Sequence, residues 1–226
     1  MIRYNIFNQI HKGLRALLYD TALTLQQTNF ANAEEAEIIL EQLKQTLDVF
    51  DKHAEHEDHG VLPAIQQYEP SIVDAFAQEH ILDHQLAENM RAQLAAFDTA
   101  TTPADKLKAG NGILHAFIAF MTFNLDHMAK EETVINERLW RYYSDAEIIG
   151  MNQRIVASIS PEEMGFTSAW MMKGMNNAEI TGWLRAVQEN APEQVFNTLF
   201  TIAEKELPYQ RFRKILEDLT EGAMVA

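Results

Sequence analysis

Three stretches of this 226-residue sequence place a histidine four residues before a second histidine or a glutamate: His53/Glu57, His80/His84 and His127/Glu131. Residues four apart lie on one face of a helix, so each pair could reach the same metal ion. A fourth stretch has one histidine, His11, in line with Phe7, Leu14 and Leu18 at helical spacing. Imidazole and carboxylate groups are ligands for iron, zinc, manganese and copper.

The seven side chains continue the apolar faces of their segments, so we expect five imidazoles and two carboxylates to face one interior. A buried polar group without a partner costs on the order of a few kcal/mol, and an unpaired carboxylate costs more. Two divalent cations would remove this cost, because neutral imidazoles bind them and carboxylates can bridge them. The pattern therefore predicts a site for two metal ions.

Four amphipathic segments position these residues, at about 2–27, 33–67, 70–97 and 103–143. Pro63 should bend or end the second segment, and residues 110–112 form a weak point in the fourth. Period-two alternation and hairpin turns are missing, which argues against strands. Four helices joined by short links predict an all-α, up-down antiparallel four-helix bundle.

The heights of the residues along these helices agree for the first three segments. His11 and His53 lie about equally far from the link near residue 30, and Glu57 and His80 about equally far from the link near 68. The fourth segment agrees less well, because His127 lies farther from the link near 101 than the third-segment histidines do. Either residues 105–112 are irregular or the fourth helix extends past its neighbour.

The remaining chain, residues 144–226, reads as shorter helices and contains no histidine. Polar or proline-containing starts recur there, each followed by an amphipathic stretch. No linker separates this region from the fourth segment. We therefore predict a bundle over residues 1–143 and a helical C-terminal extension over 144–226 that packs on it.

The arrangement resembles the hemerythrin family, including bacterial proteins with an HHE cation-binding domain. Its members carry a histidine, then His-x-x-x-Glu, then a histidine, then a histidine followed by a carboxylate, on successive helices. The matching residues are His11, His53, Glu57, His80, His127 and Glu131. His84 matches a further third-helix histidine of the oxygen carriers. Those carriers space the last pair one residue wider, which leaves Glu132 as an alternative to Glu131, whereas the spacing here resembles the iron-centre repair proteins.

The resemblance covers about residues 1–143 and implies a non-haem di-iron centre. Its two iron ions would share an oxo or hydroxo bridge, with Glu57 and Glu131 as bridging ligands and histidines as caps. It implies that the protein binds or senses dioxygen or nitric oxide. Two alternatives stay open: a redox or iron-donating enzyme acting on iron–sulfur centres, peroxide or nitric oxide, and a regulatory module that engages a protein partner or a second copy through residues 144–226.

Other histidines and other metal sites fit less well. His56 and His59 turn away from the face of His53, and His115 is too far along its helix, so we expect solvated or structural roles. A zincin would need a histidine at position 60, which is glycine. A ferritin-like site needs Glu-x-x-His on two helices, and the sequence contains none.

Composition limits the partners. With 33 acidic and 18 basic residues, the formal charge is −15, which disfavours nucleic acid and anionic lipid. The absence of cysteine excludes disulfides, thiolate zinc sites and iron–sulfur clusters. The N-terminus does not read as a signal peptide, and no apolar run is long enough to span a membrane, so we expect a cytoplasmic protein.

Overall fold

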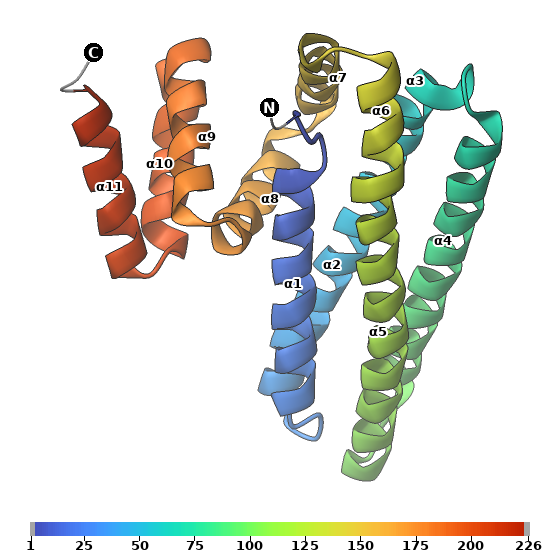
Figure 1. Ribbon diagram of the computed structural model, residues 1–226. Coiled ribbons are helices and arrows are strands. Elements are labelled where there is room, and N and C mark those ends of the chain that lie inside the picture. Colours follow the sequence, from blue (N-terminus) through green and yellow to red (C-terminus); the bar gives the residue numbers. More distant parts are fainter. Residues whose placement is uncertain (1–2, 224–226) are drawn as a thin grey trace. The chain divides into compact units, whose positions relative to one another are not determined.

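The computed structural model describes residues 3–223, which form helices and contain no strand (Figure 1). The all-α fold class expected from the sequence is therefore confirmed. The long helices are α1 (Asn8–Gln27), α2 (Ala33–Gly60), α4 (Pro70–Thr99) and α5 (Pro103–Lys130). The shorter ones are α3 (Leu62–Gln66), η1 (Glu131–Ile135), α6 (Asn136–Tyr142), α7 (Asp145–Ser158), α8 (Pro161–Gly174), α9 (Asn177–Asn190), α10 (Glu193–Glu206) and α11 (Tyr209–Ala223).

Local sequence signals account for the ends of the long helices. The side chain of Asn32 accepts a hydrogen bond from the backbone of Glu34 at the start of α2, and Thr102 does the same for Asp105 in α5. Pro63 lies in the first turn of α3, so the second predicted segment is divided where the proline was expected to interrupt it.

Helices α2 and α4 run in opposite directions. Near one end of the pair, Asp58 lies 2.7 Å from His80, and farther along, Asp48 lies 3.7 Å from Arg91. Higher residue numbers in α4 thus meet lower ones in α2. The two helices are tied by ion pairs at two levels.

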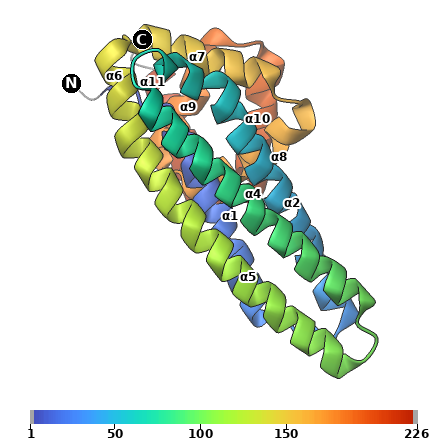
Figure 2. The same ribbon diagram turned by 90° about the vertical axis from the view of Figure 1, so that its right-hand side faces the viewer.

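Helices α4 and α5 are also antiparallel and lie side by side along their length (Figure 2). Lys130 contacts Glu79 at 2.9 Å near one end, and Lys106 donates to the carbonyl oxygen of Phe97 at 2.7 Å near the other. Helix α5 is continuous through residues 105–112, so this stretch is not irregular, and the weak point at residues 110–112 stays a prediction. A Cβ on Gly110 would lie 2.2 Å from the ring of Phe30, so this glycine makes room for that ring.

One apolar cluster closes the end of the helices where α3, α6 and α7 meet. Ile6, Ile65, Ile135 and Leu139 are buried in it, and Phe76 of α4 joins them. The π-helix η1 connects α5 to α6 within this cluster. The cluster therefore fixes the position of the segment that follows Glu131.

The chain divides into two compact units. Among residues 3–223, the first contains residues 3–8 and Leu17–Ser158, and the second contains Gln9–Ala16 and residues 159–223. Helix α7 thus belongs to the first unit. The domain boundary at residue 143 and the packing of the extension stay predictions.

Besides Gln9–Ala16 of α1, the second unit contains α8, α9, α10 and α11, which are nearly equal in length. Their starts at Pro161, Asn177, Glu193 and Tyr209 are 16 residues apart. Helix α10 packs on α8 and α9, and α11 packs on α9. Met172, Ile180, Leu184, Leu199 and Ile215 form its buried core.

Among residues 3–223, no helix combines the length and the apolar character needed to cross a membrane. A cytoplasmic location stays a prediction.

Candidate metal centre

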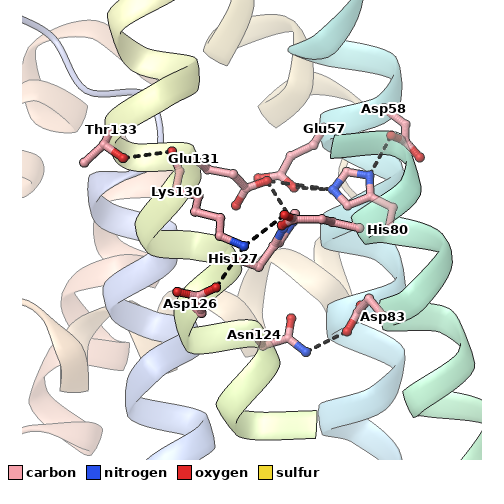
Figure 3. Close-up of polar contacts among 11 residues, drawn as sticks. Glu57, Asp58, His80, Asp83, Asn124, Asp126, His127, Lys130, Glu131 and Thr133 are labelled. Atoms are coloured by element: carbon pink, nitrogen blue, oxygen red, sulfur yellow. Dashed lines mark hydrogen bonds and ion pairs between the residues drawn. The ribbon is translucent and has the colours of Figure 1, made fainter. Parts of the chain in front are cut away.

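Two histidines and two glutamates from neighbouring helices converge in the first unit. Glu57 comes from α2, His80 from α4, His127 from α5 and Glu131 from the start of η1, and Figure 3 shows their side chains pointing toward one another. One ligand atom from each lies within 4.8 Å of the others. Each residue is at most 4% exposed, so the cluster is shielded from solvent.

The distances between these groups fit a shared cation better than a set of hydrogen bonds. Nε2 of His80 lies 3.5 Å from Glu57 and 3.8 Å from Glu131, and it makes no hydrogen bond within the part of the chain described. Nε2 of His127 lies 3.1 Å from Glu131. Two imidazole nitrogens facing two buried carboxylates form a donor set suited to a divalent transition metal. The residues present therefore fit a metal ion.

His53 adds a second group of potential ligands. Its Nε2 lies 3.1 Å from Oε1 of Glu57, one helical turn away on α2. Ligand atoms of His53, Glu57 and Glu131 also lie within 4.8 Å of one another. The two carboxylates thus belong to both groups, an arrangement in which they could bridge two ions.

The outer nitrogens of the two central histidines are held by carboxylates. Nδ1 of His80 lies 2.7 Å from Asp58, and Nδ1 of His127 lies 2.7 Å from Glu79. A proton on each Nδ1 leaves the lone pair of the inward-facing Nε2 available to a metal ion. Ligating histidines that are oriented by a carboxylate have this arrangement. Sequence reasoning missed both carboxylates, although each is adjacent in sequence to a predicted ligand, Glu57 or His80.

These contacts change the protonation of the histidines. Burial would lower the pKa of His80, but the nearby carboxylates of Glu131 and Glu57 outweigh it and raise the pKa to about 11. The same balance, with hydrogen bonds to Glu131 and Glu79, raises the pKa of His127 to about 9. Both rings therefore carry a proton on Nε2 at neutral pH in the metal-free protein. A metal ion must displace these protons in order to bind.

A buried polar pair lies one helical turn from the cluster. Asp83 accepts a hydrogen bond from the side-chain amide of Asn124 at 2.6 Å, and both residues are 3% exposed. Burial raises the pKa of Asp83. Asp83 is three residues from His80, and Asn124 is three residues from His127, so the pair continues the inner faces of α4 and α5 (Figure 3).

His84, predicted as a ligand, is not brought to the cluster. Its side chain is 52% exposed, and its Nδ1 lies 3.1 Å from Asp51 on the surface between α2 and α4. Ala87, rather than His84, follows Asp83 on the buried face of α4. Metal ligation by His84 has no support in this placement.

The other candidates are placed as follows. Glu131 is 1% exposed and belongs to both ligand groups, whereas its rival Glu132 is only partly buried and belongs to neither. His59 and His115 are exposed and His56 is partly buried, which agrees with the roles expected for them. His11 is fully buried on α1, within Gln9–Ala16 of the second unit, and its role as a ligand stays a prediction.

Comparison with known proteins gives a match to one protein family. The sequence model of the hemerythrin HHE cation-binding domain matches residues 3–139. This range contains every predicted ligand, and more than half of the chain lies within it.

The curated relatives are more distant. The chain is 22% identical to F-box/LRR-repeat protein 5 of Salmo salar over 172 residues, 76% of this chain and 24% of that protein. It is 22% identical to the proteins of the same name from Danio rerio over 152 residues (67% of this chain and 22% of that protein) and Mus musculus over 153 (68% and 21%). The chain thus spans about a quarter of the length of these relatives or less. No solved structure matches it.

Proposed function

Because the chain belongs to the hemerythrin HHE cation-binding family, we propose that its His/Glu cluster is a non-haem di-iron centre that binds or senses dioxygen or nitric oxide. The observation that carries the proposal is the sharing of Glu57 and Glu131 by two groups of ligand atoms. One group would hold an ion with His53, and the other would hold a second ion with His80 and His127.

His11 completes the proposed ligand set. Its burial and its place on the stripe of Leu14 and Leu18, which are also buried, support an inward-facing imidazole. We further propose that α1, α2, α4 and α5 form an up-down four-helix bundle around the centre. The antiparallel pairs α2/α4 and α4/α5 support this arrangement.

Iron in this setting would supply a redox-active centre to which a diatomic gas can bind reversibly. The donor set favours the ferrous state, because it has more neutral imidazoles and fewer anionic groups than carboxylate-rich di-iron sites. The ring centroids of Phe76 and Phe123 each lie 5.7 Å from that of His127, and the ring centroids of Phe50 and Phe120 lie 5.3 Å apart. Phe76 and Phe123 cover His127 and so keep water from that side of the cluster, which would protect a reversible complex from side reactions.

A second candidate function is a di-iron redox enzyme or an iron donor. The position of His84 outside the cluster favours it, because six protein ligands rather than seven leave coordination positions open on both ions. The protein partner predicted for residues 144–226 stays a prediction.

The deciding experiment measures metal content and the optical spectrum of the iron-loaded protein before and after exposure to oxygen. About two irons per chain and a visible band that appears with oxygen and disappears on its removal would support the binding protein. Two irons that oxidise irreversibly would favour the enzyme.

Glu57→Gln is the matched loss-of-site variant, because it removes a carboxylate from both groups while keeping the size of the side chain. Glu55→Gln, on an exposed position of the same helix, is its control. A wild-type protein that binds no iron, or a Glu57→Gln variant that binds two irons normally, would overturn the proposed centre.

A further inference from the structure

The backbone widens directly after Glu131. Residues Glu131–Ile135 form a π-helix between two α-helical segments. The backbone N–H of Asn136 bonds the carbonyl groups of Glu131 and Thr133 instead of that of Glu132, its partner four residues earlier in a regular α-helix. Single π-turns of this kind are often found at functional sites.

The side-chain amide of Asn136, rather than its backbone N–H, donates a hydrogen bond to the carbonyl group of Glu132. Its Nδ2 donates to the carbonyl oxygen of Glu132 at 3.1 Å and to Oδ1 of Asn5 at 2.7 Å. Asn5 also accepts a hydrogen bond from the backbone of Phe7 at 2.9 Å, just before α1 begins. The Asn136 side chain is fully buried, and its Oδ1 makes no hydrogen bond among the residues described. Burying an amide whose oxygen has no partner costs free energy that an apolar side chain of similar size would not cost. The two hydrogen bonds donated by Nδ2 offset this cost.

The wide turn reconciles two demands on one helix. Glu131 must face the cluster, and Ile135 and Leu139 must face the apolar core, and all three are buried. In a regular α-helix with 3.6 residues per turn, each four-residue step overshoots by roughly 40°, so Leu139 would point about 80° away from the face of Glu131. The extra residue of the π-turn absorbs this difference.

We propose that Asn136 is a positioning residue of the metal centre, which stabilises the π-turn by binding the Glu132 carbonyl and thereby keeps Glu131 facing the ions. This inference rests on the proposed metal centre. It assigns to Asn136 a role at the site although its side chain contacts none of the ligand atoms in the two groups.

The test compares Asn136→Leu, which has no donor, with Asn136→Thr, whose hydroxyl can bond the carbonyl four residues earlier. Thr133 makes such a bond to the Ala129 carbonyl at 3.0 Å in the same segment. Thr133→Ala, an exposed change in the π-turn, is the control for a merely structural effect. The readouts are anaerobic iron(II) affinity and amide hydrogen exchange of residues 131–136 in the metal-free protein.

Asn136→Leu should weaken iron(II) binding about 10- to 100-fold, the usual effect of losing a group that orients a ligand, and speed amide exchange in the turn. Asn136→Thr and Thr133→Ala should stay close to wild type in both measurements. Asn136→Ala replaces the leucine variant if that one does not fold.

Equal affinity for wild type and Asn136→Leu, or equal losses for the leucine and threonine variants, would overturn the role of Asn136 alone. A wild-type protein that binds no iron(II) would instead overturn the proposed centre, and the role of Asn136 with it.

Discussion

Oδ1 of Asp58 lies 2.7 Å from Nδ1 of His80, although the two residues belong to different helices. Asp58 is the neighbour of Glu57 in sequence, and Glu79, the neighbour of His80, holds His127 in the same way at 2.7 Å. Each of two ligand helices therefore also supplies the carboxylate that orients a ligand on the next helix. Metal geometry and helix packing are coupled through these two contacts.

Asp58→Ala should weaken iron(II) binding about 10- to 100-fold, because the imidazole of His80 loses the acceptor that fixes its orientation. Competition with a chelator of known affinity measures the change. Glu55→Ala is the control, an exposed acidic residue of the same helix. An Asp58→Ala variant with wild-type affinity would show that packing alone orients His80.

The metal-free protein should lose stability as the pH rises from 7 to 10. The pKa values of His80 and His127 are higher in the folded chain than the ordinary 6.5, at about 11 and about 9. Their contribution is therefore complete below about pH 6.5 and is lost as the pH rises through 9 and then 11. Denaturant unfolding with a chelator present, repeated across this range, measures the free energy of unfolding.

Glu131→Gln is the control for this pH dependence, because the carboxylate of Glu131 makes the largest of the contributions that raise both pKa values. Its stability should change less between pH 7 and 10 than that of wild type. A metal-free wild type that gains stability over this range would contradict the assignment of protonated imidazoles.

The sequence predicted those parts of the site that depend on one helix alone. His53/Glu57 and His127/Glu131 each lie on one face because of helical geometry, and the structure keeps both pairs within 3.1 Å. The contacts of Asp58 and Glu79 depend on how neighbouring helices are rotated about their axes. A pattern read along one segment does not determine that rotation.

The placement of His84 shows the same limit within one helix. Residues three and four positions after His80 both lie near its face, so Asp83 and His84 were equally compatible with the stripe that includes Phe76 and Ala87. The structure buries Asp83, which pairs with Asn124, and exposes His84. The sequence did not predict the π-turn. Its buried residues Glu131, Ile135 and Leu139 are four positions apart, a spacing that also occurs on the buried face of a regular α-helix.

Gly174→Ala should destabilise the protein by about 1–3 kcal/mol, because a Cβ there would lie 2.1 Å from the backbone carbonyl oxygen of Lys12, which cannot move aside easily. Thermal unfolding should show a melting temperature lower by several degrees, at about 2–4 °C per kcal/mol for a chain of this size. Gly182→Ala, in α9 with no atom within 4 Å of the added Cβ, should instead stabilise by about 0.5–1 kcal/mol. Equal effects of the two changes would contradict the close approach at Gly174.

His84→Ala should leave iron stoichiometry at the wild-type level, whereas His80→Ala should lower it. The two histidines are one helical turn apart on α4, but His80 is 3% exposed within the cluster and His84 is half exposed beside Asp51. Glu131→Gln and Glu132→Gln form a parallel comparison on η1, in which only the first should reduce the iron content, because Glu131 belongs to both ligand groups. Iron content per chain after loading and desalting measures all four variants. Loss of iron in His84→Ala would mean that the side chain of His84 turns inward when metal binds. The centre would then have seven protein ligands, as the sequence predicted.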